Sequence, residues 1–121
     1  MNNVESIRQY CLSKPMVTES LPFDNVTLVF KVDGKIFALL NLEGAQSVNL
    51  KCNPERAIEL REQYSEVQPG FHMNKKHWNT VTYNGRLANN LICEMIDASY
   101  MLVVEGLSKE KQKAILIMMS K

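Results

Sequence analysis

The dipeptide Asp33-Gly34 constrains the fold of this chain more than any other feature. It stands directly between two runs rich in β-branched and aromatic residues, 27–32 and 35–42. A type I′ turn needs a positive φ at both central residues, and Asp-Gly is one of the pairs that adopts it most readily. The two runs are therefore predicted to form an antiparallel hairpin, so the chain must contain an antiparallel sheet.

Two further strands are predicted beyond this hairpin. Residues 47–52 alternate apolar and polar side chains, and residues 77–83 alternate in the same way, as strands with one face on a core do. In the second of these strands we expect Trp78 to anchor the core, because large aromatic side chains are usually buried. Residues 15–25 carry two prolines and several Ser, Thr, Asp and Asn residues, which favour turns or extended backbone.

Helical spacing of apolar residues and helix caps predict four helices. Asn53 followed by Pro54 is typical of a helix start, and Gly106 is typical of a helix end. The predicted helices cover residues 4–12, 54–64, 87–105 and 109–119. We therefore expect one α+β domain over residues 1–121, with an antiparallel sheet of about four to five strands and helices packed on one face.

Composition and charge exclude several classes of protein. The chain has 121 residues, of which 45% are apolar and 22% charged, so it can bury a core and is not a disordered chain. The 14 Lys and Arg residues are nearly balanced by 13 Asp and Glu, which excludes an overall basic surface that coats nucleic acid. No signal peptide or membrane span is recognisable, so a cytoplasmic protein without a membrane partner is expected.

The most unusual segment is residues 69–80, with the sequence PGFHMNKKHWNT. No acidic residue occurs between Glu66 and Glu94, whereas Lys75, Lys76 and Arg86 are cationic. A basic segment with interleaved aromatic rings suits phosphate contacts from the lysines and ring contacts with nucleotides. The alternative is that the lysines are merely solvated and that Trp78 belongs to the core.

Residues typical of metal sites or catalytic sites are not grouped in this sequence. The three cysteines stand about forty residues apart, which argues against a disulfide framework and against a zinc site. His72 and His77 have no carboxylate or cysteine at a companion spacing, so no metal and no cofactor are expected. Neither Ser99 nor Cys52 stands in a nucleophile elbow, which disfavours hydrolytic chemistry.

Several motifs, taken in order, resemble the bacterial MmcQ/YjbR family. They are YCLSKP at 10–15, LVFKV at 28–32, VNLKC at 48–52, PGFHMNKKHWNTV at 69–81, and Ser99-Tyr100 followed by Leu102-Val103. The resemblance covers roughly residues 7 to 105. It implies an α+β fold similar to frataxin/CyaY, no enzymatic activity, and a "double-wing" unit proposed to bind DNA.

The resemblance and the basic segment together define the candidate site. Lys14, Lys31 and Lys35 also match basic positions of the family nearer the amino terminus. The candidate nucleic-acid-binding residues are Lys51, His72, Asn74, Lys75, Lys76, His77, Asn79 and Arg86.

Two functions follow from these residues as hypotheses. The first is a non-enzymatic DNA-binding protein that contacts phosphates weakly through the His/Lys/Trp loop. The alternative is a small-ligand or protein-interaction module that uses the sheet face and the same loop. A positive surface joining the candidate cations would favour DNA, whereas an enclosed pocket lined by His72, Trp78 and an unpaired carboxylate would favour a small molecule. We expect a monomer, and the apolar residues 115–119 leave a dimer open.

Overall fold

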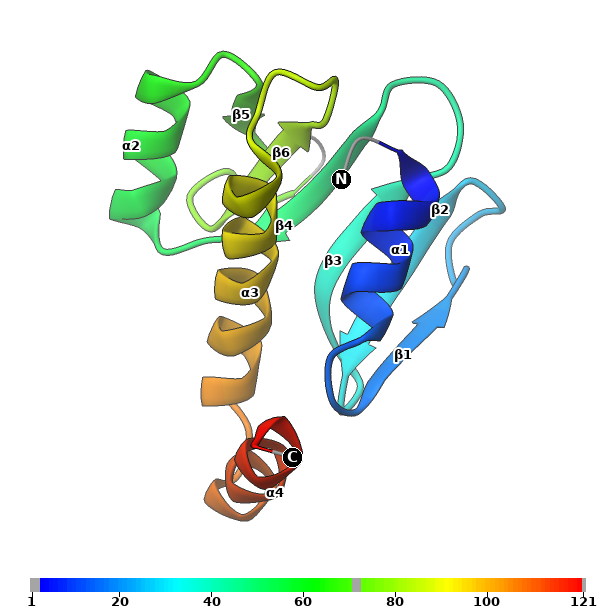
Figure 1. Cartoon of the computed structure of the whole chain (residues 1–121), viewed down its shortest axis with the longest axis vertical. Coiled ribbons are helices and arrows are strands. Elements are labelled where there is room, and N and C mark those ends of the chain that lie inside the picture. The colour runs from blue at the N-terminus through cyan, green and yellow to red at the C-terminus, as the bar shows by residue number, and fades with distance from the viewer. Residues whose placement is uncertain (1–2, 71–72, 121) are drawn as a thin grey trace.

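The predicted hairpin lies inside a single antiparallel sheet (Figure 1). The computed structural model describes residues 3–70 and 73–120. Within these residues the strands are β1 (Val17–Ser20), β2 (Thr27–Val32), β3 (Lys35–Asn41), β4 (Ser47–Lys51), β5 (Val67–Pro69) and β6 (Trp78–Thr82). Their order across the sheet is β1-β2-β3-β4-β6-β5, and every neighbouring pair is antiparallel. The α+β fold class is thus confirmed.

The turn between β2 and β3 has the expected backbone. Asp33 has φ 50° and Gly34 has φ 79°, so both central residues are in the left-handed region. Val32 pairs with Lys35 directly across the turn, as a two-residue hairpin loop requires. The prediction of the type I′ hairpin is confirmed.

A valine at position 34 should therefore destabilise the protein through the backbone alone. A Cβ built at Gly34 meets nothing within 4 Å, so no clash contributes, but a β-branched residue at this φ is strained by more than about 1 kcal/mol. We expect Gly34→Val to lower the melting temperature clearly. Gly34→Asn is the control and should melt close to wild type, because Asn tolerates the left-handed region. Equal melting of all three proteins would contradict this account of the turn.

The sheet has six strands, not the expected four to five, because it contains two short edge strands. Among residues 3–70 and 73–120, β1 pairs only with β2, and β5, three residues long, pairs only with β6. Pro69 is tolerated in β5 because an edge strand can leave one side of its backbone unpaired. Their sequences show little alternation of apolar and polar residues. β1 lies within residues 15–25, for which the sequence predicts turns or extended backbone.

The four helices begin and end within two residues of their expected bounds. They are α1 (Val4–Leu12), α2 (Pro54–Gln63), α3 (Asn89–Glu105) and α4 (Lys109–Met119). The side chain of Asn53 accepts hydrogen bonds from the backbone N–H groups of Glu55 and Arg56, and that of Ser108 from Lys111. The expected caps are thus present. No helix within the described residues is long and apolar enough to cross a membrane.

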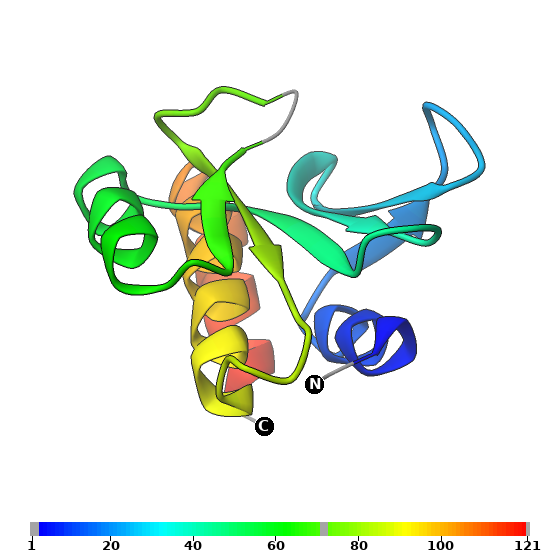
Figure 2. The ribbon, with the colours of Figure 1, turned by 90° about the horizontal axis from the view of Figure 1, so that it is seen from above.

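The core lies between the sheet and α3, which crosses β2, β3 and β4. Buried residues recur along α3 at helical spacing. They face the buried side chains of the central strands, such as Phe37 and Leu40 of β3, while Ile7 and Cys11 of α1 close the core at one side. In the part of the chain that the structure describes, the opposite face of the sheet carries no helix, and loops rise on both sides of it (Figure 2).

Candidate functional site

A wide groove lies on the open face of the sheet. It has a volume of about 840 Å3, in the size range of small-molecule sites. Two loops flank it, one between β1 and β2 and one between β5 and β6 (Figure 2). Its lining residues are Phe23, Thr27, Leu39, Asn41, Ala45, Ser47, Asn49, Gln68, Pro69, Met73, Thr80 and Thr82.

The floor of the groove is a row of side chains that crosses four strands. Leu39 pairs with Asn49, Asn49 pairs with Thr80, and Thr80 pairs with Gln68. Residues directly opposite each other on neighbouring strands share a face, so these side chains lie beside one another. The Thr80 hydroxyl donates to Oδ1 of Asn49 at 2.5 Å, which orients the Asn49 amide. The floor thus presents amides and hydroxyls in fixed positions.

None of these lining residues is charged. The strands contribute seven polar residues with amide or hydroxyl side chains to this lining, and Phe23, Leu39 and Met73 add apolar side chains. Such a surface binds neutral groups that carry hydrogen-bond donors and acceptors beside a flat or apolar part. It offers little to a group whose binding depends on its charge.

The loop before β6 is held by its own polar side chains. Oδ1 of Asn74 accepts from the backbone N–H of Lys76 at 3.0 Å, and the carbonyl of Asn74 accepts from Trp78 at 3.0 Å. Nζ of Lys75 donates to the carbonyl of Gly70 at 3.1 Å. Asn74 and Lys75 therefore shape this loop, whereas the side chain of Lys76 is exposed.

Arg61 of α2 supports the same loop from the helix side. Its guanidinium donates to the carbonyls of Lys75 and Trp78 and, through Nε, to Oδ1 of Asn79 at 2.7 Å. The sequence indicates only that Arg61 interleaves with glutamates on a solvated helix face. No local signal identifies this role, because the partners lie 14 to 18 residues further along the chain.

Trp78 does not anchor the core, and this expectation was wrong. The core side of β6 consists of Asn79, Val81 and, just beyond the strand, Tyr83, all buried. Trp78 lies on the other face and is half-buried. Its Cβ packs against Gly70, where an added Cβ would come within 2.8 Å of it, so the two loop ends approach closely only because residue 70 is glycine.

Three of the predicted cations lie around Trp78, next to the groove floor, although none of them is among the lining residues. Lys51 pairs with Trp78, the pair next to Asn49 and Thr80 along the same face. Lys75 and Lys76 precede Trp78 in the loop between β5 and β6. Among the described residues, no carboxylate forms an ion pair with Lys51, Lys75 or Lys76.

The other candidates lie elsewhere. Arg86 follows the opposite end of β6 and forms an ion pair with Glu66 at 3.8 Å, so no continuous positive surface joins it to the lysines. Asn79 is 2% exposed and bonded to Arg61, which removes it from the surface contacts that the sequence predicts. His77 is half-buried at the start of β6, and His72 lies outside the described residues.

Lys14 is also turned away from the groove. Its Nζ contacts Oδ1 of Asp97 on α3 at 2.5 Å and lies 4.7 Å from the centroid of the Tyr10 ring. The Tyr10 hydroxyl donates to the same Asp97 oxygen, and burial raises the pKa of Tyr10. These contacts join α1 to α3 on the helix side, so Lys14 stabilises the fold there.

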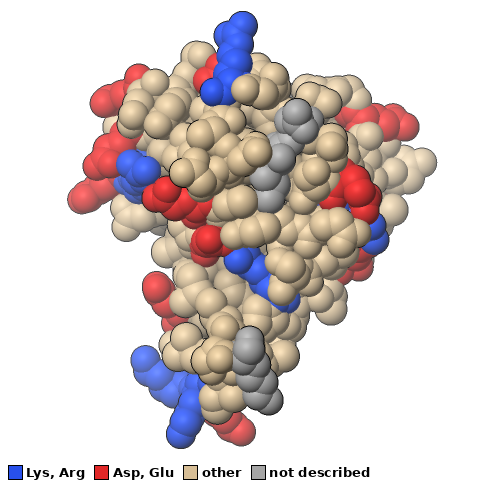
Figure 3. Space-filling view, in the orientation of Figure 1, with Lys and Arg blue, Asp and Glu red and all other residues tan. Residues whose placement is uncertain are grey.

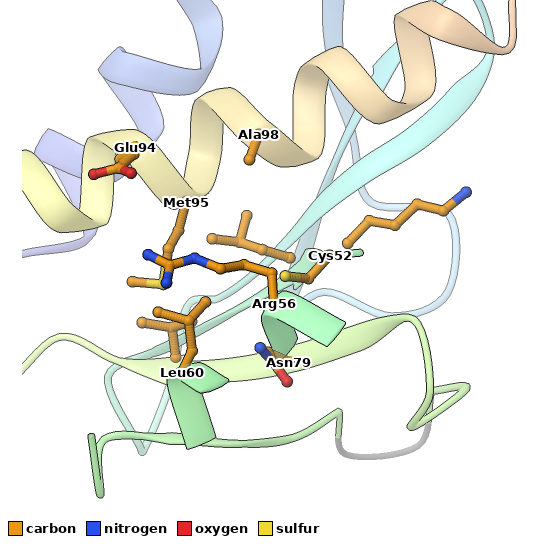
Figure 4. A pocket seen from close by; sticks show the side chains of 10 residues that line it. Cys52, Arg56, Leu60, Asn79, Glu94, Met95 and Ala98 are labelled. Atoms are coloured by element: carbon orange, nitrogen blue, oxygen red, sulfur yellow. The ribbon is translucent and has the colours of Figure 1, made fainter. Parts of the chain in front are cut away.

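A second, smaller pocket lies between α2 and α3 (Figure 4). Its volume is about 50 Å3, room for only a few water molecules. Asn79 lines it, and within the described structure Nδ2 of Asn79 has no hydrogen-bond partner. Cys52 lines it too, and burial raises the pKa of this thiol. The size of this pocket leaves the groove as the candidate site.

Charges on the helix-bearing face do not form a basic surface. Lys and Arg side chains are interspersed there with Asp and Glu (Figure 3). No group of three or more His, Cys, Asp or Glu side chains that could hold a metal ion occurs among the residues the structure describes. The groove and the three lysines beside it are therefore the best candidate for binding.

The chain is similar to known proteins over most of its length. The sequence model of the YjbR family matches residues 12–102. Uncharacterized protein YjbR of Escherichia coli strain K12 is 39% identical over 111 residues, which are 91% of this chain and 94% of that protein. Uncharacterized protein YbdF of Escherichia coli O157:H7 is 38% identical over 112 residues, which are 92% of each chain.

Solved structures share the fold. The crystal structure of Deinococcus radiodurans protein DR2400 has a TM-score of 0.88 and 38% identity, and the match covers 95% of this chain and 88% of that one. The crystal structure of a Pseudomonas syringae protein has a TM-score of 0.71 and 28% identity, covering 83% and 97%.

Proposed function

The chain belongs to the YjbR family, and from this premise we propose that it is a cytoplasmic, non-enzymatic DNA-binding protein that acts as a monomer. The observation that supports this function best is the position of three lysines around Trp78: Lys51 pairs with it across β4 and β6, and Lys75 and Lys76 precede it in the loop that also carries the groove residue Met73. A strand of nucleic acid could lie in the groove with its phosphates toward these lysines.

The strength of binding follows from the small number of cations. Each lysine that neutralises a phosphate releases condensed counterions, and this release supplies most of the affinity of sequence-independent binding. The chain has a net charge of only +1. We therefore expect a dissociation constant on the order of micromolar or weaker at physiological salt.

The neutral lining of the groove also favours the alternative function. With a volume of about 840 Å3, it could hold a small neutral molecule or a peptide segment. In that case the lysines would be solvated and would not contact the ligand. Salt dependence separates the two functions, because a neutral ligand releases few counterions.

The proposed function is tested by titrating labelled DNA with the protein between about 50 and 200 mM salt. We expect affinity to fall linearly on a double-logarithmic plot. Lys76→Ala should lower the slope of log K against log salt by about 1, because one phosphate contact is lost. Lys76 is preferred to Lys75 for this test because the ammonium of Lys75 also holds the loop.

The matched control removes the same charge from a distant surface. Lys113 is an exposed residue of α4, on the helix side of the sheet. Lys113→Ala should leave the slope at the wild-type value. If Lys76→Ala and Lys113→Ala behave alike, the loop is not the DNA site. If wild type binds no DNA even at low salt, the small-ligand function replaces this proposal.

A further inference from the structure

We propose that the groove binds unpaired bases, so that the protein prefers single-stranded DNA to duplex DNA. This inference rests on the proposed function and assigns a role to the neutral part of the same site. It follows from the chemistry of the lining residues, from the exposed side chain of Phe23, and from the position of the lysines relative to both.

The uncharged lining is suited to the edges and faces of bases, which are accessible in a single strand and covered in a duplex. In a duplex, the Watson–Crick edges and the faces of the bases are occupied, and the outermost groups are phosphates. A neutral groove gains little from phosphates, but its amides and hydroxyls can bond to the free edges of unpaired bases. Asn49 and Thr82 offer both donors and acceptors there, and Gln68, whose Nε2 donates to the carbonyl of Ser65, offers its carbonyl oxygen.

Phe23 supplies a surface on which a base can stack. Its side chain lines the groove from the loop between β1 and β2, yet the residue is 66% exposed. Proteins that bind single strands commonly stack bases on such aromatic rings, and the contact tolerates any base because every base has a π-face. An exposed Phe on the rim of a groove lined by hydrogen-bonding groups fits this mode.

Hydrogen bonds hold the end of the loop that carries Phe23. The binding of a base therefore does not have to order the whole loop. Oδ1 of Asp24, the next residue, accepts from the backbone N–H groups of Val26 at 3.0 Å and Thr27 at 2.7 Å. These bonds fix the entry into β2 directly beside the ring. Hydrogen bonding to these amides lowers the pKa of Asp24.

Lys51 and Lys76 lie in segments that continue directly from lining residues of the groove. Lys51 is two residues beyond Asn49 on the same face of β4, a distance of about 7 Å along the strand. Lys76 belongs to the loop opposite the one that carries Phe23. A strand whose bases occupy the neutral floor reaches these lysines if its backbone extends along β4 beyond Asn49.

The test compares a labelled single strand with the duplex of the same sequence at one salt concentration. We expect the single strand to bind about tenfold more tightly, the contribution of one or more stacked bases. Phe23→Ala should lower single-strand affinity about tenfold and leave duplex affinity unchanged. Phe23→Trp should retain single-strand binding because it keeps an aromatic face.

The matched control is Leu21→Ala, in the same loop. Leu21 is 46% exposed, like Phe23 a surface apolar residue, but it is not among the lining residues of the groove. This variant should bind both forms of DNA as wild type does. Melting curves of all variants should coincide, since exposed truncations change stability little.

The possible failures are distinguishable. If both forms of DNA bind equally and Phe23→Ala binds like wild type, while Lys76→Ala still lowers the salt slope, the base-binding role is wrong and the proposed function stands. If Phe23→Ala weakens duplex and single-strand binding to the same degree, Phe23 is a general contact and the preference for unpaired bases is refuted. If neither form binds at low salt, the proposed function fails and this inference fails with it.

Discussion

Phe37→Ala should lower the free energy of unfolding by roughly 3 to 5 kcal/mol. Phe37 lies in β3, is 0% exposed, and faces α3. Its ring and the Tyr100 ring form a T-shaped pair with a centroid distance of 5.4 Å and an interplanar angle of 84°, and its centroid lies 6.4 Å from that of the Phe30 ring. The truncation removes buried area and leaves a cavity between the sheet and its main helix.

An effect of this size is a large part of the 5 to 15 kcal/mol that stabilises an ordinary domain. Urea denaturation of wild type and Phe37→Ala measures it directly. Phe23→Ala is the matched control: the same atoms are deleted at a position that is 66% exposed, so stability should change by less than about 0.5 kcal/mol. Similar midpoints for the two variants would contradict the burial assigned to Phe37.

The parts of the fold that could be predicted are those specified by neighbouring residues. Asp33-Gly34 determines a two-residue turn because both φ values must be positive, and Asn53-Pro54 determines a helix start because the Asn side chain caps the backbone. The long helix over Asn89–Glu105 follows from its own apolar spacing. Each of these signals is complete within a few residues.

The edge strands and the position of Trp78 depend on the rest of the sheet. β5 is only three residues long and exists because β6 offers an unpaired edge. In β6 the alternation correctly separates Trp78 and Thr80 from Asn79 and Val81. It does not say which set is buried, and the size of the Trp side chain suggested the wrong one. Val81 and the adjacent Tyr83 occupy the core side instead.

Only part of the candidate site could be predicted, because some of its residues are brought together by strand pairing between distant segments. Lys75 and Lys76 are neighbours in sequence, and Lys51 joins them because β4 pairs with β6, a contact that spans nearly thirty residues. Arg86 is closer in sequence, but β6 separates it from the lysines. Phe23 has no motif that marks it as a site residue, and only the folded sheet brings its loop beside the groove.

Ser99, which the sequence analysis considered as a nucleophile, forms hydrogen bonds that stabilise the fold. It is 0% exposed on α3. Its hydroxyl donates to the carbonyl of Phe37 at 2.5 Å and accepts from the backbone N–H of Lys51 at 2.8 Å. The pairing of β3 and β4 reaches only to Ala38 and Leu50, so the hydroxyl bridges the next two backbone groups where the strands separate. It also fixes the backbone of Lys51, beside the groove.

Ser99→Ala should therefore destabilise the protein by about 2 to 6 kcal/mol, because one buried and one partly buried backbone group lose their partner and each unpaired group costs about 1 to 3 kcal/mol. Ser20→Ala, at an exposed position of β1, should change stability by less than about 0.5 kcal/mol. Amide hydrogen exchange gives a local measurement: the Lys51 N–H should exchange faster in Ser99→Ala, beyond the acceleration that the loss of global stability causes in the core of α3. If the variant unfolds at the wild-type urea concentration, or the Lys51 amide keeps its protection, the hydroxyl does not join the two strands.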